Sequence, residues 1–277
     1  MTRDVRPVAV LGNLSKDRVP GLGEYRLGGA PFWAARALQL ADEYPLRLGV
    51  RCAEQDRSLL LPPLMALGEP VSWRPARATA TFAYTYSGDE RFMHVEAVGE
   101  PWELDGLRGW LDELLDPVEW VHVGALARSD FPRDTREAIA RGRSVLFDGQ
   151  GLVRPGLPGE LHLDGDFDHE LLRFVTALKL SEEEAETVVG GEVTAASLAE
   201  LGVPEVLVTR GSRGALLWTA GELKELKTEA LEIGDPTGAG DAFCLFYATA
   251  RARGRSPLEA ARHAVTMSTR SLSPPSG

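Results

Sequence analysis

Asp235-Pro236-Thr237-Gly238-Ala239-Gly240-Asp241 leads directly into the apolar run Ala242-Phe243-Cys244-Leu245-Phe246-Tyr247. The small residues of this stretch allow a tight turn that brings the backbone close to a ligand, because glycine has no Cβ and tolerates positive φ. The residues that follow, through about Arg253, are rich in alanine and contain no glycine or proline. This composition predicts a buried helix whose N-terminus lies at the glycines.

A helix N-terminus presents unpaired N–H groups and the positive end of the helix dipole, so it favours the binding of an anion. The carboxylate of Asp241 would repel an anion that is only held there. It is useful if a hydroxyl must be deprotonated while negative charge develops beside it, and this favours phosphoryl transfer. On this segment alone the alternative stays open that Asp and Thr are helix caps and the glycines an ordinary turn.

The bulk properties restrict the class of protein. With 277 residues the chain can form one large α/β domain or two small ones, and its net charge of −11 argues against a nucleic-acid partner. Cys52 and Cys244 are its only cysteines, and both lie in apolar segments without metal-ligand spacing, which favours a role in the core. The N-terminus lacks an apolar signal segment, and no apolar run is long enough to cross a membrane. We expect a cytoplasmic protein without a membrane partner.

Apolar runs typical of strands alternate along the chain with segments of helical composition. This alternation predicts a mostly parallel sheet with helices on both faces, in which ligands bind at the carboxyl ends of the strands. The expected strands are residues 8–14, 46–52, 119–126, 144–147, 176–180 and 205–209, and the expected helices are 31–41, 57–67, 135–141, 182–189 and 194–201.

One stretch departs from this alternation. Residues 79–87 alternate in polarity, and Gly88-Asp89-Glu90 is typical of a turn. Residues 91–98 would form the returning strand, so the stretch predicts a β-hairpin. A hairpin cannot join a parallel sheet without a crossover, so we expect it to project as a small β flap. Over the carboxyl edge of the sheet it would exclude water from a reacting phosphate. A surface hairpin without such a role is the alternative.

Several other classes of site are excluded or unsupported. The chain has no Gly-x4-Gly-Lys-Ser/Thr loop, which excludes a P-loop phosphotransferase, and Gly21-Leu22-Gly23 lacks the third glycine of a dinucleotide fingerprint. The histidines are scattered, and a structural role is favoured for each of them: His94, His122, His162, His169 and His263.

Taken together, five segments of the chain resemble the ribokinase-like sugar kinases, the PfkB carbohydrate kinase family. The resemblance implies a three-layer α/β/α sandwich with a mostly parallel sheet and a small β lid. It implies a single domain over residues 1–277, with the hairpin lid inserted around residues 78–98. In the family's C-terminal signature, matched by residues 235–241, the last Asp is the catalytic base and the preceding amides form the anion hole. Here these are Asp241 and Gly238, Ala239 and Gly240.

The acceptor side of the resemblance lies near the N-terminus. Gly28-Gly29-Ala30-Pro31 is similar to the glycine pair that lies beside the sugar at the entry to the first helix, and Asp17 corresponds to the acid that binds sugar hydroxyls. The family's Asn after the glycine pair is absent, and Trp33 stands in its place. The resemblance therefore implies an acceptor site formed by Asp17, Gly28 and Gly29, with Trp33 as an apolar wall.

The donor side lies in the C-terminal half. Val208-Thr209-Arg210-Gly211-Ser212-Arg213-Gly214-Ala215 resembles the strand and turn that hold nucleotide phosphates. It implies that Thr209, Arg210, Gly211 and Gly214 contact the nucleotide, together with Gly238 and Gly240.

Two cation sites are also implied. Lys179-Leu180-Ser181-Glu182-Glu183-Glu184 falls where the family has Asn-x-x-Glu, which arranges water around magnesium. Ser181 replaces the Asn, but Glu184 is retained, which implies that it acts on Mg²⁺ through water. A monovalent cation often lies beside the family's loop that begins at the position of Asp235, and this sequence permits one.

The segment Asp148-Gly149-Gln150-Gly151-Leu152-Val153-Arg154 follows an expected strand with a sharp turn. It places Asp148, Gln150 and Arg154 at the active edge, with Gln150 as a substrate contact. This segment and Thr79-Ala80-Thr81-Phe82 look more like the inositol-kinase-like branch than like ribokinase itself.

The sequence thus predicts an ATP- and Mg²⁺-dependent kinase that phosphorylates a hydroxyl of a small sugar or cyclitol, acting as a monomer or homodimer. A nucleoside kinase of the same fold and a non-catalytic sugar- or nucleotide-binding homologue are alternatives. Hydride transfer on a Rossmann-like fold is a third, and it would require nicotinamide binding.

Overall fold

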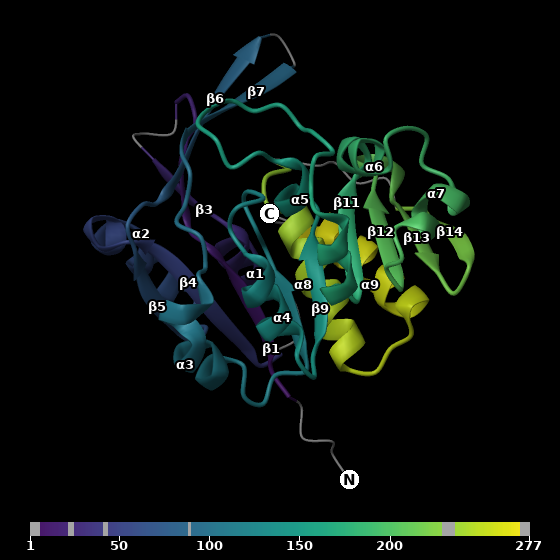
Figure 1. Cartoon of the computed structure of the whole chain (residues 1–277), viewed down its shortest axis with the longest axis horizontal. Helices are drawn as coiled ribbons and strands as arrows, with labels where there is room; N and C mark the ends of the chain where they lie inside the picture. The colour runs from purple at the N-terminus through teal and green to yellow at the C-terminus, as the bar shows by residue number, and fades with distance from the viewer. Residues whose placement is uncertain (1–5, 22–24, 41–43, 88–89, 229–235, 272–277) are drawn as a thin grey trace, which may run out of the picture.

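The computed structural model describes residues 6–21, 25–40, 44–87, 90–228 and 236–271. In these residues a large sheet is covered by helices on both faces, and a second, smaller sheet lies beyond one end of it (Figure 1).

Within the described residues, the large sheet has nine strands in the order β14-β13-β12-β11-β9-β8-β1-β4-β5. Its strands from β12 to β5 pair in parallel, and β13 and β14 are added antiparallel at one edge. The mostly parallel sheet expected from the sequence is confirmed. The strands are β1 (Val8–Asn13), β4 (Leu46–Ala53), β5 (Val71–Ala76), β8 (Trp120–Val123), β9 (Ser144–Asp148), β11 (Ala177–Ser181), β12 (Glu205–Thr209), β13 (Ala215–Thr219) and β14 (Glu222–Leu226).

Every residue of β1 is buried, as expected for a central parallel strand with helices on both faces. Its side chains alternate between two hydrophobic cores: Val8 and Val10 enter one, and Ala9 and Leu11 enter the other. The two cores make the fold a three-layer α/β/α sandwich.

The first core contains residues of α1 (Ala30–Leu38), α2 (Arg57–Met65), α8 (Ala239–Ala252) and α9 (Pro257–Ser271). The second contains residues of α3 (Leu104–Leu114), α4 (Arg133–Ala140), α5 (Gln150–Val153), α6 (Glu182–Val189) and α7 (Ala195–Glu200).

The smaller sheet has the order β10-β7-β6-β2-β3. The predicted hairpin is present as β6 (Ala80–Ser87) and β7 (Glu90–Ala97), which project beyond the main sheet in Figure 1. The hairpin is joined by further strands: β2 (Ser15–Arg18) pairs in parallel with β6, and β3 (Arg26–Gly28) and β10 (Gly159–Glu160) extend the sheet. These added strands are short and polar, so periodicity did not reveal them.

Several predicted element bounds need correction. The strand expected over residues 119–126 ends at Val123. The backbone at Gly124 passes close to the start of α1, since a Cβ built on Gly124 would lie 2.0 Å from the Cβ of Ala30. The helices expected at 31–41, 57–67 and 135–141 are α1, α2 and α4. The strands β5, β13 and β14 and the helices α3 and α9 were not anticipated.

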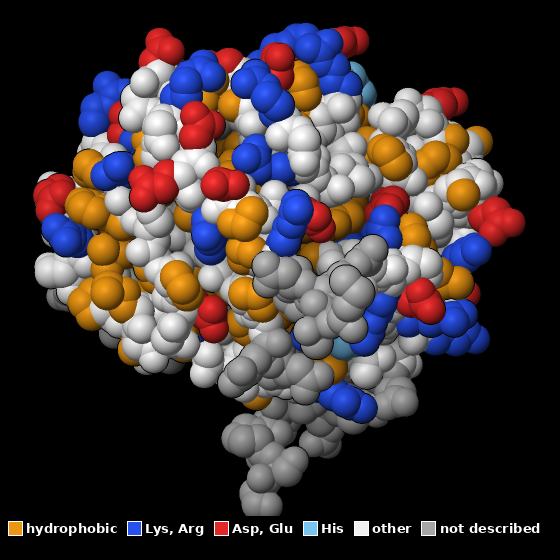
Figure 2. Space-filling view, turned by 90° about the horizontal axis from the view of Figure 1, so that it is seen from below, with side chains coloured by type: hydrophobic (Ala, Val, Ile, Leu, Met, Phe, Trp, Pro, Cys, Tyr) orange, Lys and Arg blue, Asp and Glu red, His pale blue; other side chains and the backbone are white. Residues whose placement is uncertain are grey.

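Figure 2 shows the molecule from below, at the end away from β6 and β7. On the part of this face that is described, Lys and Arg side chains are interspersed with Asp and Glu side chains and with hydrophobic ones. Among the described residues, no helix combines the length and apolar character that a membrane span requires.

Candidate active site

The turn that opens α8 has the backbone predicted for it. Gly238 is the N-cap residue, with φ 82° and ψ 0°, and it offers no side-chain cap to the first turn of the helix. A Cβ at this position would lie 2.4 Å from the Trp33 ring. Only glycine satisfies both conditions, the left-handed backbone and the close approach of the indole.

This turn borders a cavity of about 500 Å³. Residues expected to contact the acceptor, the metal or the reacting hydroxyl come together there from elements far apart in sequence. Aromatic and apolar side chains of β6 and β7 line the same cavity as Asp241. The lining residues are Ser15, Asp17, Gly29, Trp33, Phe82, Tyr84, Met93, Leu126, Asp148, Gln150, Arg154, Lys179, Glu184, Pro236, Thr237, Gly238, Ala239, Gly240 and Asp241.

A second cavity, of about 150 Å³, lies on the other side of the turn. It brings together the strand-and-turn segment after β12 with apolar residues of α8 and α9. Its lining residues are Thr209, Gly211, Gly214, Thr228, Pro236, Ala239, Gly240, Phe243, Val265, Ser268 and Thr269. Both cavities are lined by Pro236, Ala239 and Gly240, so the turn is their shared boundary.

Asp241 lies in the first turn of α8, and its Oδ1 atom is buried without a hydrogen-bond partner among the described residues. Burial raises the pKa of this carboxyl to about 7, and the negative charges of Asp148 and Asp17 add to the effect. Lys179 and Arg154 act in the opposite direction. A carboxyl that titrates near neutrality and has an unused oxygen is suited to accept a proton.

This pKa leads to a testable pH dependence. Only the ionised carboxylate of Asp241 can accept a proton, so kcat/KM for the acceptor should fall below about pH 7, by about tenfold per pH unit. The measurement is a pH profile at constant ionic strength. A rate that stays level down to pH 5 would contradict the role of Asp241 as the titrating base.

Asp17 and Gly28 form one unit in the smaller sheet. The Ser15 hydroxyl donates to Asp17 Oδ1 at 2.8 Å, and a Cβ on Gly28 would lie 2.4 Å from Asp17 Oδ2. Gly28 therefore makes room for the Asp17 carboxylate, while Gly29, with φ 99°, lines the cavity directly.

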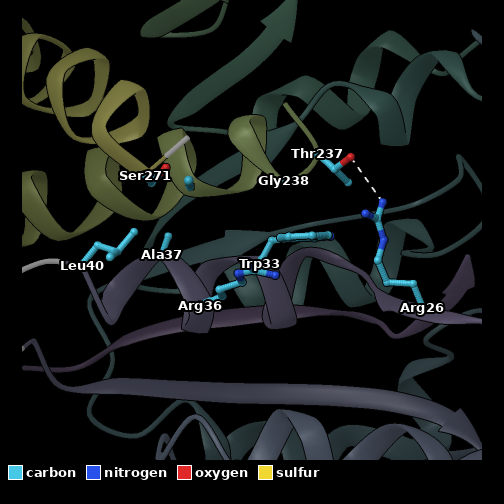
Figure 3. A pocket seen from close by; sticks show the side chains of 9 residues that line it. Arg26, Trp33, Arg36, Ala37, Leu40, Thr237, Gly238 and Ser271 are labelled. Atoms are coloured by element: carbon cyan, nitrogen blue, oxygen red, sulfur yellow. Dashed lines mark hydrogen bonds between the residues drawn. The ribbon is translucent and has the colours of Figure 1, made fainter. Parts of the chain in front are cut away.

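Trp33 is half-buried and lines both the main cavity and a smaller one of about 100 Å³, whose lining Figure 3 shows. The guanidinium carbons of Arg26 and Arg36 lie 5.4 and 5.5 Å from the centre of its ring. Arg26 also donates to Thr237 Oγ1 at 3.3 Å, which connects β3 to the turn (Figure 3). These contacts hold the indole against Gly238.

Comparison with known proteins shows what the chain resembles in sequence and in fold. Residues 165–274 match the profile described as pfkB family carbohydrate kinase. Over 135 residues the chain is 35% identical to inositol 3-kinase of Zea mays, a match that covers 47% of this chain and 34% of that protein. The chain thus spans about a third of the length of this curated relative.

Two solved structures align along almost the whole chain. One is a pyrophosphate-dependent kinase in the ribokinase family, complexed with a pyrophosphate analog and myo-inositol. The alignment with this structure has a TM-score of 0.79 at 20% sequence identity, and it covers 96% of this chain and 94% of that chain. The other is Arabidopsis thaliana ribokinase complexed with ribose and ATP, with a TM-score of 0.69 at 22% identity, covering 97% and 96%. The chain has the ribokinase fold, and its residues 165–274 match the pfkB family carbohydrate kinase model. The resemblance seen in the sequence and the expected fold class are both confirmed.

The two departures from the pfkB pattern have clear structural settings. Trp33, in place of an Asn, is the wall described above. Ser181, in place of the other Asn, is the N-cap of α6: its hydroxyl accepts from the Glu184 amide, and the Glu184 carboxylate accepts from the Ser181 amide. These two hydrogen bonds hold the Glu184 side chain at the cavity, while the Ser181 hydroxyl caps the N-terminus of α6.

The donor-side residues of the pfkB resemblance differ in their placement. Thr209, Gly211 and Gly214 line the second cavity. The Arg210 guanidinium instead pairs with Glu225 of β14 at 2.5 Å. Three backbone amides were expected to hold an anion. The amide of Ala239 is one of them, and it already donates a hydrogen bond to the Pro236 carbonyl within the turn. Asp235, the expected cation ligand, lies outside the described residues.

Lys179 is a site residue that the sequence did not lead us to expect. It lies on β11, is 6% exposed, and lines the main cavity beside Gly240. A lysine inside an otherwise apolar strand was the available signal, since a buried ammonium requires nearby negative charge.

Proposed function

We propose that this protein is a carbohydrate kinase that transfers a phosphoryl group from ATP to a hydroxyl of a small sugar or cyclitol. The observation that carries the proposal is the shared boundary of the two cavities. One cavity holds the polar groups suited to a polyol, the other opens beside Thr209, and both end at the turn before Asp241. A phosphoryl group that crosses this turn passes directly from donor to acceptor.

In the proposed reaction Asp241 takes the proton of the attacking hydroxyl. The amides of Gly238 and Gly240 and the N-terminus of α8 stabilise the charge on the transferred oxygens, and one well-placed donor of this kind contributes about 3–4 kcal/mol. The elevated pKa of Asp241 supports this role, because a base close to neutrality accepts a proton well. The amide of Ala239 contributes less to this charge stabilisation, since it already donates a hydrogen bond to the Pro236 carbonyl.

The carboxylates at the cavity fit a magnesium requirement. Asp148 and Glu184 offer the hard oxygen donors that Mg²⁺ prefers, and Glu184 is oriented by its capping contact with Ser181. When bound, the ion neutralises charge on the donor phosphates. We place Glu184 at the ion through water. The monovalent cation near Asp235 stays a prediction.

The acceptor site is proposed between the smaller sheet, which supplies Asp17 as well as Phe82, Tyr84 and Met93, and the segment after β9, which supplies Gln150 and Arg154. The cavity thus combines polar groups with apolar side chains. This combination suits a ring with hydroxyls at its edge and C–H groups on its face. The strands β6 and β7 would act as a lid that excludes water from the reacting phosphate. Myo-inositol and ribose, bound in the two structural neighbours, are the first acceptors to try.

The test is a transfer screen. Purified protein is incubated with Mg²⁺ and either ATP or pyrophosphate, against inositols, ribose, fructose, sugar acids and nucleosides, and the phosphorylated product is detected by mass spectrometry. We expect acceptor-dependent ADP release with at least one sugar or cyclitol. Transfer only to nucleosides, transfer only from pyrophosphate, or nucleotide binding without turnover would each replace the proposal with a different function.

Trp33 provides a separate prediction about selectivity. Trp33→Asn removes the apolar wall of the acceptor cavity without touching the cavity beside Thr209. The ratio of kcat/KM between two acceptors should therefore change by about tenfold, with a much smaller change in KM for ATP. Trp33→Phe, which retains an aromatic wall, is the matched control. An unchanged acceptor profile would mean that Trp33 only packs against α8.

A further inference from the structure

Lys179 has an unusual environment for a buried ammonium. Its Nζ atom lies 3.5 Å from Asp148 Oδ1 and 3.9 Å from Glu184 Oε2, and its side chain is 8% exposed. Charge-assisted N–H···O bonds are normally about 2.7–2.9 Å long. The contact with Asp148 is its one hydrogen bond among the described residues, although an ammonium has three N–H donors. The hydrogen-bonding capacity of Lys179 is therefore largely unused.

A partly buried ion pair elsewhere in the same protein shows the contrast. Arg251 and Glu205 lie 2.7 Å apart, and the Tyr247 hydroxyl donates to the same Glu205 carboxylate at 2.6 Å. This pair is closed by short hydrogen bonds and lines neither of the two cavities. Lys179 is more open, and it faces the cavity.

The ammonium also lies against the turn at which the two cavities meet. A Cβ built on Gly240 would lie 2.9 Å from Lys179 Nζ and 3.5 Å from its Cε. The lysine thus approaches the first turn of α8 at a residue without a side chain. An anion at this helix N-terminus would be within reach of both the backbone amides and the ammonium.

The cavity supplies the charge that keeps Lys179 protonated. Burial alone would lower the pKa of the ammonium, but the carboxylates of Asp148 and Glu184 raise it above its usual value. Lys179 is therefore a permanent cation at the pH of any ordinary assay. It cannot act as a proton donor there, but it can hold negative oxygens.

A metal ion is the other way to place positive charge here. Ligand atoms of His122, Asp148 and Cys244 lie within 4.8 Å of one another, and both ring nitrogens of His122 are buried without a partner among the described residues. Burial and the charge of Lys179 lower the pKa of His122 to about 3, so the ring stays neutral beside an existing cation. A cation bound directly by these three groups would be repelled by the ammonium, which favours Lys179 as the positive group at this point, whereas Mg²⁺ is placed at Glu184 through water.

We propose that Lys179 is a further catalytic residue, whose ammonium binds the phosphoryl group during its transfer across the turn. This inference rests on the proposed function. The acceptor oxygen forms a bond to the γ-phosphorus while the bond from that phosphorus to the bridging oxygen breaks. The electron pair leaves with ADP, and the hydroxyl proton passes to Asp241. Lys179 keeps all its protons and holds an equatorial oxygen of the transferred group.

The test compares wild type with Lys179→Met, Asp148→Asn and the double variant. Inorganic phosphate is titrated calorimetrically into each protein, kcat is measured on the acceptor found by the screen, and thermal unfolding checks the fold. We expect phosphate affinity and kcat to fall about tenfold or more on loss of the ammonium, since charged hydrogen bonds are involved. Lys224→Met, on the exposed edge strand β14, should change neither quantity.

The double variant keeps the test decisive if Lys179→Met does not fold, because it leaves no buried carboxylate unpaired at position 148. A folded double variant that binds phosphate and turns over as Asp148→Asn does would overturn the proposal and leave Lys179 a structural partner. If wild type transfers a phosphoryl group to no acceptor, the proposed function fails, and the phosphate titration alone still decides whether the Lys179 ammonium binds phosphate.

Discussion

Asp241→Asn should lower kcat by about 10²–10⁴, because general-base catalysis contributes a factor of this size and the amide cannot accept the proton. The substitution keeps the volume of the side chain and leaves the amides of Gly238 and Gly240 in place. KM for ATP should change little, since the lost interaction belongs to the transition state. The measurement is steady-state kinetics on the acceptor found by the screen.

The matched control is Asp105→Asn. Asp105 also lies in the first turn of a helix, α3, but it is exposed and lines neither cavity. It should leave kcat unchanged, which separates loss of the base from a general effect of charge on a helix N-terminus. If folded Asp241→Asn turns over at the wild-type rate, Asp241 is not the base and the mechanism is wrong.

Gly238→Ala should lower kcat by about 10²–10³, which is the loss caused by removing an oxyanion-hole donor. Two effects combine at this position. The φ of 82° is strained for any residue with a Cβ, and that Cβ would meet the Trp33 ring at 2.4 Å. The turn must therefore move, and with it the amides at the boundary of the two cavities.

Gly21→Ala separates the two effects. Gly21 has the same φ of 82°, but a Cβ there would meet nothing within 4 Å. This variant should show the cost of backbone strain in thermal unfolding while kcat stays at the wild-type level. Equal losses of kcat in both variants would mean that strain alone, and not displacement of the catalytic turn, explains the effect at Gly238.

The sequence alone predicted the features that depend on local chemistry. The alternation of apolar strands with helices indicated the parallel sheet, and the run from Gly238 to Asp241 indicated a turn followed by a buried helix. Because the strands of a parallel sheet end at one edge, the chain order by itself placed residues that follow those strands, such as Asp148 and Gln150, at the site.

Pairings between distant segments were decided only by the tertiary structure. The short polar strand Ser15–Arg18 forms because β6 lies beside it, and Arg26–Gly28 pairs in turn with Ser15–Arg18, so no local pattern marks either strand. Arg210 is predicted from its turn to contact the nucleotide, but β14 brings Glu225 against it. The position of Lys179 beside Gly240 likewise depends on tertiary packing, because residues of β11 and of the first turn of α8 come together there. Periodicity and turn composition are properties of neighbours in sequence, whereas the partner of a charge is set by how elements pack.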